Sequence, residues 1–226
     1  AFAYQGTAPI IGMDEILRAL VGKNRLDQKD YYELVLQMRS ANFRYLPFSA
    51  DELLFHVRNA PVVDGEVVET SELKVLKNYF AACLIDGRQF QKPSADRPAG
   101  PDGEMEFIQL FSEAVTGAIY EVWNDSNLEE MKRIAYANWI LFNLHLDHAG
   151  LLHAINGERS EQNDTFRLAV SLVGLLIRGL DLPDSRDEPE QSWQKRYLGW
   201  LRNQLLSPCF ASNPPLISSV ADIING

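Results

Sequence analysis

Apolar residues recur at helical spacing along almost the whole chain after residue 103, and this periodicity constrains the fold more than any other feature. Residues 104–123 place Phe107, Phe111, Val115 and Val122 on one broad face, at the intervals of an amphipathic helix. Polar breaks then separate further predicted helices over residues 128–145, 164–180, 192–206 and 215–224. We therefore predict a mainly α protein, built as a helical bundle or array, with a few short β-strands in its N-terminal part.

Two of these helices carry more specific predictions. The segment from Asp164 or Thr165 to Leu180 is apolar nearly all round, which is typical of a helix at the centre of a bundle. The helix over 192–206 precedes Pro208, which has no backbone N–H to continue a helix and is expected to end it.

A break in composition separates these helices from the first part of the chain. Residues 91–103 contain three prolines and two glycines, a composition typical of a linker. We predict a domain boundary here, with one domain over residues 1–92 and a helical domain over residues 103–226.

The first domain is predicted to combine helices with short strands. The stretch from Pro9 to Pro47 reads as a strand at 9–11, two helices beginning at Met13 and after Asp27, and a return strand over 43–47. A third helix begins after Ser49. Asp64-Gly65 between β-branched residues indicates a hairpin, with an ordinary turn as the alternative because the arms have only two or three residues. A further helix is expected to end at Asp86-Gly87.

This order of elements resembles a known family. The segments MDEILRAL, DQKDYYELVLQMRSANFRYLP and SADELL are similar to the C-terminal half of bacterial PIN-like domains. The closest likeness is to the kind found beside tetratricopeptide repeats and a transcript-cleavage-factor-like module in predicted conflict or stress-response proteins. The resemblance covers roughly residues 5–92. It implies that a complete domain would be a Mg²⁺- or Mn²⁺-dependent ribonuclease, with acidic residues holding the metal.

The chain departs from the family where the chemistry would lie, because most of the family's acidic residues come from the N-terminal half of the domain. Only Asp14 lies near the place of a late acidic residue. Its alternative role is that of a first-turn residue facing the positive end of the helix dipole. We expect this chain to be a fragment that is itself non-catalytic and that contacts RNA only through a complete PIN-like domain.

A second candidate site is the histidine-rich segment that contains His145, Asp147, His148 and His153. His145 and His148 are three residues apart and would share a face of one helix, which makes them candidate metal ligands. Structural or surface histidines are the alternative, because Gly150 can end the helix and the His-Glu-x-x-His spacing of zinc hydrolases is absent.

Charge and cysteine content limit the remaining functions. Residues 1–60 hold seven basic and seven acidic residues, so the net charge of −10 resides in residues 61–226. An acidic surface repels phosphates, which excludes a broad nucleic-acid-binding face there. Cys83 and Cys209 are too few for a disulfide framework, and the apolar run from Leu168 to Ile177 is too short to span a bilayer.

Two hypotheses follow for a cytoplasmic protein with no membrane association. The chain is the non-catalytic C-terminal portion of a PIN-like ribonuclease, or it is an acidic helical module that binds a protein partner with a basic face.

Overall fold

The computed structural model describes residues 12–43, 46–90, 103–156, 162–182 and 192–225. These residues are mainly α-helical, with a two-stranded antiparallel hairpin, and the predicted fold class is confirmed. The chain forms two compact units, residues 1–47 with 74–107 and residues 48–73 with 108–226. Residues 48–73 thus group with the C-terminal helices. The boundary predicted within 91–103 falls almost wholly outside the described residues and stays a prediction.

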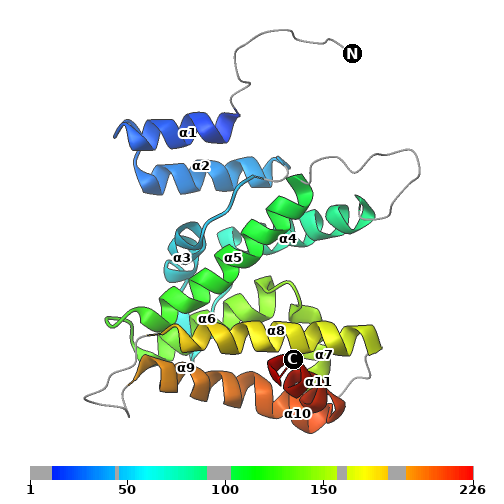
Figure 1. The fold of residues 1–226 in the computed structure, drawn as a ribbon. Helices are drawn as coiled ribbons and strands as arrows, with labels where there is room; N and C mark the ends of the chain where they lie inside the picture. The colour runs from blue at the N-terminus through cyan, green and yellow to red at the C-terminus, as the bar shows by residue number, and fades with distance from the viewer. Residues whose placement is uncertain (1–11, 44–45, 91–102, 157–161, 183–191, 226) are drawn as a thin grey trace. The chain divides into compact units, whose positions relative to one another are not determined.

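Helices α1 (Met13–Gly22) and α2 (Gln28–Ser40) lie side by side in the first unit (Figure 1). Helix α1 begins where it was predicted to begin, and the carboxylate of Glu15 accepts the N–H of Gly12 at 2.9 Å. Asn24 lies in the turn between the helices with a φ of 53°, a left-handed conformation that asparagine tolerates. The strand predicted over 9–11 lies outside the described residues.

The return strand predicted over 43–47 is not formed in its described residues, Phe43, Leu46 and Pro47. Side chains satisfy the backbone groups that a neighbouring strand would have bonded. The hydroxyl of Tyr79 accepts the N–H of Leu46, and the guanidinium of Arg39 donates to the carbonyl of Pro47, both at 2.8 Å. Local alternation of apolar residues cannot reveal such contacts, because Tyr79 is distant in sequence.

An aromatic core organises the first unit around α4 (Ser71–Phe90), which runs past its predicted end at Asp86-Gly87. The ring of Tyr79 lies 5.4 Å from that of Phe80 and 6.5 Å from that of Phe107, distances at which aromatic rings attract one another. The buried apolar residues of this unit are Tyr31, Tyr32, Val35, Leu46, Leu76, Tyr79, Phe80, Cys83 and Phe107.

The second unit contains most of the helices. It begins with α3 (Ala50–Arg58), whose N-cap Ser49 accepts the N–H of Glu52 at 3.2 Å, as its sequence predicts. Helix α5 spans Gly103–Asn124 and contributes residues from Ile108 onward. The remaining elements are α6 (Glu130–Leu144), α7 (His148–Ile155), α8 (Gln162–Leu180), α9 (Trp193–Leu201), the π-helical turn η1 (Arg202–Leu206), α10 (Ser207–Ser212) and α11 (Pro215–Asn225).

The predicted hairpin is confirmed in residue detail. Strand β1 (Val62–Val63) pairs with β2 (Glu66–Val67) across Asp64 and Gly65. These two turn residues have φ values of 52° and 80°, as the type I′ turn requires. The local Asp-Gly signal is therefore sufficient to form the turn even between strands of only two residues.

The core of the second unit is built around three aromatic residues from α5 and α9. The rings of Trp123, Tyr197 and Trp200 lie 5.4 to 5.8 Å from one another, and all three are buried. Their polar atoms are used where they reach acceptors: Tyr197 donates to the carbonyl of Leu175 at 2.9 Å, and Trp200 donates to Asn138 at 2.8 Å. This cluster fixes α8 and α6 to α9.

Pro208 does not end the helix before it, contrary to the sequence prediction. Helical backbone continues from α9 through η1 into α10, and the N–H of Ser207 bonds the carbonyl of Arg202 five residues earlier. In an ordinary α-helix the proline ring would press against the carbonyl of Gln204. A π turn widens the backbone at this point, and the chain can therefore pass through the proline.

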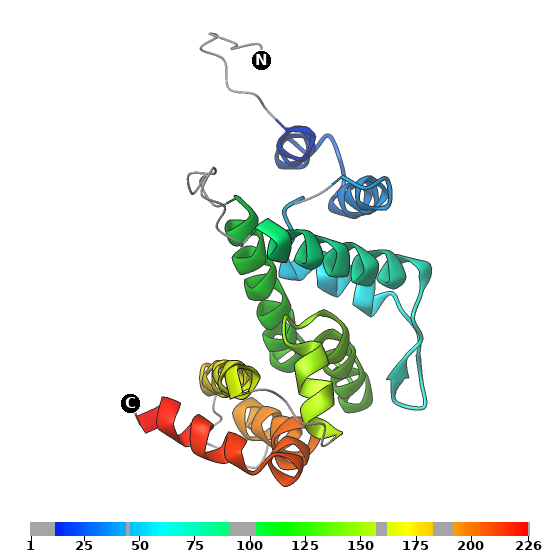
Figure 2. The same ribbon diagram turned by 90° about the vertical axis from the view of Figure 1, so that its right-hand side faces the viewer.

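The sequence of α8 is apolar nearly all round and predicted a helix at the centre of the bundle. This prediction is wrong. Helix α8 packs against α11, α9 and α7, and Figure 2 shows it nearly end on with α11 running across it. Its remaining face is exposed to solvent. These helices cover only part of the circumference of α8, and the helical pattern alone could not indicate this.

Two helical glycines provide a matched test of packing between α8 and α9. A Cβ atom on Gly179 would lie 2.5 Å from the ring of Tyr197, whereas a Cβ atom on Gly199 would meet nothing within 4 Å. We expect Gly179→Ala to lower the free energy of unfolding by about 1–3 kcal/mol through overpacking. Gly199→Ala should raise it by about 0.5–1 kcal/mol by restricting the unfolded chain. Urea denaturation of both variants measures the difference, and equal effects would contradict this packing.

Candidate functional site

Asp14, the predicted catalytic candidate, is buried between α1 and α2. Its two carboxylate oxygens are engaged, one accepting from the hydroxyl of Tyr31 at 2.7 Å and the other pairing with Arg18 at 2.9 Å. Burial of the Tyr31 hydroxyl, followed by its contact with the Asp14 carboxylate, raises the pKa of Tyr31 well above its usual range. These contacts join the two helices, and a catalytic role for Asp14 stays a prediction from the family resemblance.

The predicted histidine site lies at the junction of α6 and α7. His145 is the C-cap of α6 and His148 is the first residue of α7. The prediction that both lie on one face of a single helix is therefore wrong. The ring Nδ1 of His145 accepts the N–H of Asp147 at 3.2 Å, and the ring Nδ1 of His148 lies 2.8 Å from the carbonyl of His145. Gly150, predicted to end the helix, lies within α7.

Asp147 is the charged centre of this junction. Its carboxylate accepts hydrogen bonds from Arg167 and Ser171 on α8, and the residue is buried. A buried carboxylate is stable when it is paired and hydrogen-bonded in this way. The contacts tie the turn between α6 and α7 to α8, and this supports a structural role for the segment.

The described residues contain no group of three or more His, Cys, Asp or Glu side chains placed to hold a metal ion. The side chain of His153 lies outside the described residues. A metal role for His145 and His148 therefore stays a prediction.

The two cysteines are buried free thiols. Burial raises the pKa of the Cys209 thiol to about 11. Since the thiolate is the reactive form, Cys209 is poorly suited to act as a nucleophile at neutral pH.

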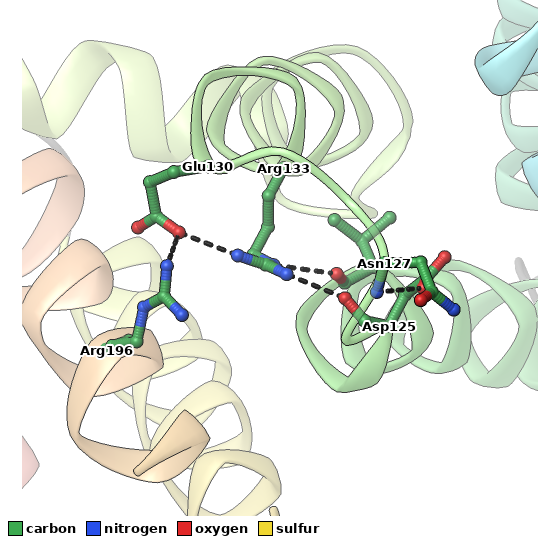
Figure 3. A network of polar contacts seen from close by, with 6 residues as sticks. Asp125, Asn127, Glu130, Arg133 and Arg196 are labelled. Atoms are coloured by element: carbon green, nitrogen blue, oxygen red, sulfur yellow. Dashed lines mark hydrogen bonds and ion pairs between the residues drawn. The ribbon is translucent and has the colours of Figure 1, made fainter. Parts of the chain in front are cut away.

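A polar network surrounds Arg133 on α6 (Figure 3). This side chain is only 1% exposed. Its guanidinium donates to the carbonyl of Val122 at 3.2 Å, to the carbonyl of Asp125 at 2.6 Å, and to the carboxylate of Glu130 at 2.6 Å. It thereby binds carbonyls at the C-terminal end of α5, which a helix leaves without intrahelical partners.

The same network continues to α9 through Glu130 and Trp193. The Glu130 carboxylate pairs with Arg196 as well as with Arg133. The indole of Trp193 lies 4.5 Å from the Arg133 guanidinium and 4.7 Å from that of Arg196, within the range of cation–π attraction. The network therefore holds the C-terminal end of α5, helix α6 and helix α9 together.

The exposed face of α8 is the feature that distinguishes this unit. Four large apolar side chains, which we call the α8 stripe, are Phe166 (61% exposed), Val170 (47%), Ile177 (56%) and Leu180 (62%). At 100° per residue they fall within a sector of about 80° on the helix. Ile217 and Ile224 of α11 are also exposed. Large apolar side chains that are exposed together on one face of a helix are typical of an interaction site.

Sequence reasoning missed both the Arg133 network and the α8 stripe. The spacing of Glu130 and Arg133, three residues apart on one helix, is a signal of an ion pair, but nothing local shows that this pair is buried under Trp193. The apolar residues of α8 are evident in the sequence, whereas their exposure depends on how few helices surround them.

Comparisons with known proteins leave the chain unassigned, because no family model, curated protein or solved structure matches it. Among the described residues, no helix has the length and apolar character needed to cross a membrane.

Replacement of Arg133 tests the importance of its network. Arg133→Met would remove the donor of the buried Val122 carbonyl and one of the two donors of the Asp125 carbonyl, which keeps the N–H of Leu128. We expect the free energy of unfolding to fall by about 1–3 kcal/mol. Arg202→Met, at an exposed position, should change it by less than about 0.5 kcal/mol. Guanidinium denaturation monitored by tryptophan fluorescence measures both, and a similar small effect at both sites would contradict the network's role.

The pH dependence of stability reports on His145. Burial, opposed by the charge of Asp147 and reinforced by His148, lowers the pKa of His145. The unfolded chain therefore binds a proton that the folded chain excludes as pH falls below about 6.5, the ordinary histidine value. The free energy of unfolding should decline from that pH down to the lowered pKa of the folded state. Below that pKa, His145 should lower it no further. His145→Asn keeps an acceptor for the N–H of Asp147 and should flatten this decline in pH-dependent denaturation; an unchanged slope would contradict it.

Proposed function

We propose that this chain is a non-catalytic helical module of a cytoplasmic protein, and that it binds another protein surface through the α8 stripe. The observation that carries the proposal is the exposure of four large apolar side chains on one face of a well-packed helix. Complete burial of a large apolar side chain contributes about 1.5–3 kcal/mol. Since roughly half of each of these side chains is exposed, a partner that covers the stripe would gain about 1 kcal/mol from each.

The organisation around the stripe supports binding without catalysis. Asp147 engages Arg167 and Ser171 of α8, and the hydroxyl of Tyr197 holds the backbone of α8 at Leu175. These contacts present the stripe on a fixed helix, which reduces the entropy lost on binding. The wider context of a PIN-like metal-dependent ribonuclease from a bacterial conflict system stays a prediction that rests on sequence resemblance alone.

A pair of acidic substitutions on the stripe tests the proposal. Val170→Asp with Ile177→Asp should leave the fold intact because both side chains are exposed, and should remove binding by placing unpaired charges in the interface. Quantitative mass spectrometry of proteins retained by the immobilised chain compares the variant with the wild type. We expect the retained amount of any specific partner, or of a soluble copy of the chain itself, to fall by at least about tenfold in the variant. This fall is equivalent to about 1.4 kcal/mol of binding free energy.

The matched control makes the same change elsewhere. Leu110 and Met131 are 43% and 60% exposed and lie outside the stripe, so Leu110→Asp with Met131→Asp should retain every partner. Circular dichroism verifies that both double variants are folded. Equal retention by wild-type and stripe-variant chains would exclude the α8 stripe as a binding surface.

A further inference from the structure

We propose that the occupant of the α8 stripe is a second copy of this chain, with the two α8 helices antiparallel about a twofold axis near Gly174. This inference rests on the proposed binding function of the stripe and adds the identity of the partner. A twofold interface requires that one patch be complementary to itself. Helix α8 meets this requirement in its apolar residues, its charges and its backbone.

The apolar residues of the stripe are arranged nearly symmetrically along the helix. Val170 precedes Gly174 by four residues and Ile177 follows it by three, while Phe166 and Leu180 lie eight before and six after. An antiparallel copy would therefore set Val170 beside the partner's Ile177, and Phe166 beside the partner's Leu180. The four-, seven- and three-residue intervals fit the heptad spacing with which paired helices bury a common seam.

Charges beside the stripe are complementary in the same arrangement. Arg167 lies in α8 seven residues before Gly174, and Asp181 lies seven residues after it, in the turn that directly follows α8. Both residues are exposed. Antiparallel pairing at Gly174 brings Arg167 of one copy to Asp181 of the other, and the symmetric contact forms at the opposite end.

The guanidinium of Arg167 is already oriented for such a contact. Its Nε donates to Asp147, while 54% of the side chain stays exposed. A guanidinium carries five N–H donors, so its terminal nitrogens can bind a second carboxylate while Nε keeps Asp147.

Gly174 permits the close approach that this geometry needs. It is exposed, and a Cβ atom at this position would meet nothing within 4 Å. Two helices that cross at facing glycines have no side chains between them at that point, so their flanking apolar residues can interdigitate.

The local charge favours a second copy over the partner with a basic face that the overall composition suggested. The charged residues next to the stripe, Arg167 and Asp181, carry one positive and one negative charge, although the whole chain carries −10. These two charges balance, and a strongly basic surface would meet Arg167 beside the stripe. Self-association through this face places balanced charges at the contact, while the net charge of −10 on each copy opposes association over longer distances.

Disulfide trapping tests the predicted register. Gly174→Cys has open space for its side chain, and the native Cys83 and Cys209 are buried. Two copies paired at this position bring the new thiols within disulfide distance. Mild oxidation of the purified chain should give a covalent dimer that a reducing agent dissolves. Lys195→Cys, exposed on α9, should remain monomeric under the same conditions.

Sedimentation equilibrium supplies a readout that needs no cysteine. The wild-type chain should approach twice its monomer mass at about 100 μM, a concentration suited to a small and weak interface. Asp181→Arg places two arginines together at each end and should raise the dimer dissociation constant at least about tenfold. Asp181→Glu keeps the negative charge and should retain association. Glu121 is an exposed acidic residue on α5, and Glu121→Arg should leave the dimer dissociation constant unchanged.

A monomeric wild-type chain with no disulfide formation at Gly174→Cys overturns the second-copy proposal. If the wild-type chain retains a different protein and the Val170→Asp, Ile177→Asp variant does not, the stripe still binds protein, and its partner is not a second copy. If no protein is lost either, both proposals fail.

Discussion

The buried guanidinium of Arg133 is the interaction on which the helical array of the second unit depends. Moving a charged side chain out of water costs several kcal/mol unless its donors are satisfied. Arg133 meets two backbone carbonyls near the end of α5 and the carboxylate of Glu130 on its own helix. One side chain thereby fixes the turn between α5 and α6 and provides the cationic surface on which Trp193 of α9 lies.

The position of α8 follows from this arrangement. Trp193 begins α9, and the next residues along that helix bring Tyr197 and Trp200 against Trp123. Tyr197 then bonds the backbone of α8 at Leu175 and fills the space beside Gly179. On another side, Asp147 anchors Arg167 and Ser171. With α11 packed across α8 as well, the helix is held firmly by neighbours that leave the α8 stripe uncovered.

Signals that act over a few residues could be predicted from the sequence. Asp64 and Gly65 formed the expected turn, Ser49 capped its helix, and Pro215 began the last one. In each case the deciding physics is a backbone conformation or a hydrogen bond between near neighbours. Most of the helices, and the mainly α class, follow from such signals together with apolar periodicity.

Features set by distant residues could not be predicted in this way. The strand expected over 43–47 gave way because Tyr79 and Arg39 took its backbone groups. Pro208 was accommodated by a π turn. The histidines at 145 and 148 were separated by a helix end, so their spacing no longer described one face. The burial of Arg133 required Trp193, sixty residues later, to cover it.

Helix α8 shows how an incorrect prediction can still carry information. A helix that is apolar on every side is most stable when every side is removed from water. The sequence does not show whether the covering residues belong to the same chain or to another. The structure supplies cover on three sides and leaves one open. The residues of the open side are those with a near-symmetric arrangement about Gly174 and with Arg167 and Asp181 at equal intervals. In an antiparallel pair, the residues of one helix lie beside those of the other in reverse order. Because the apolar and charged residues of α8 are complementary to their own reverse order, a second copy of α8 is the neighbour expected on the open side.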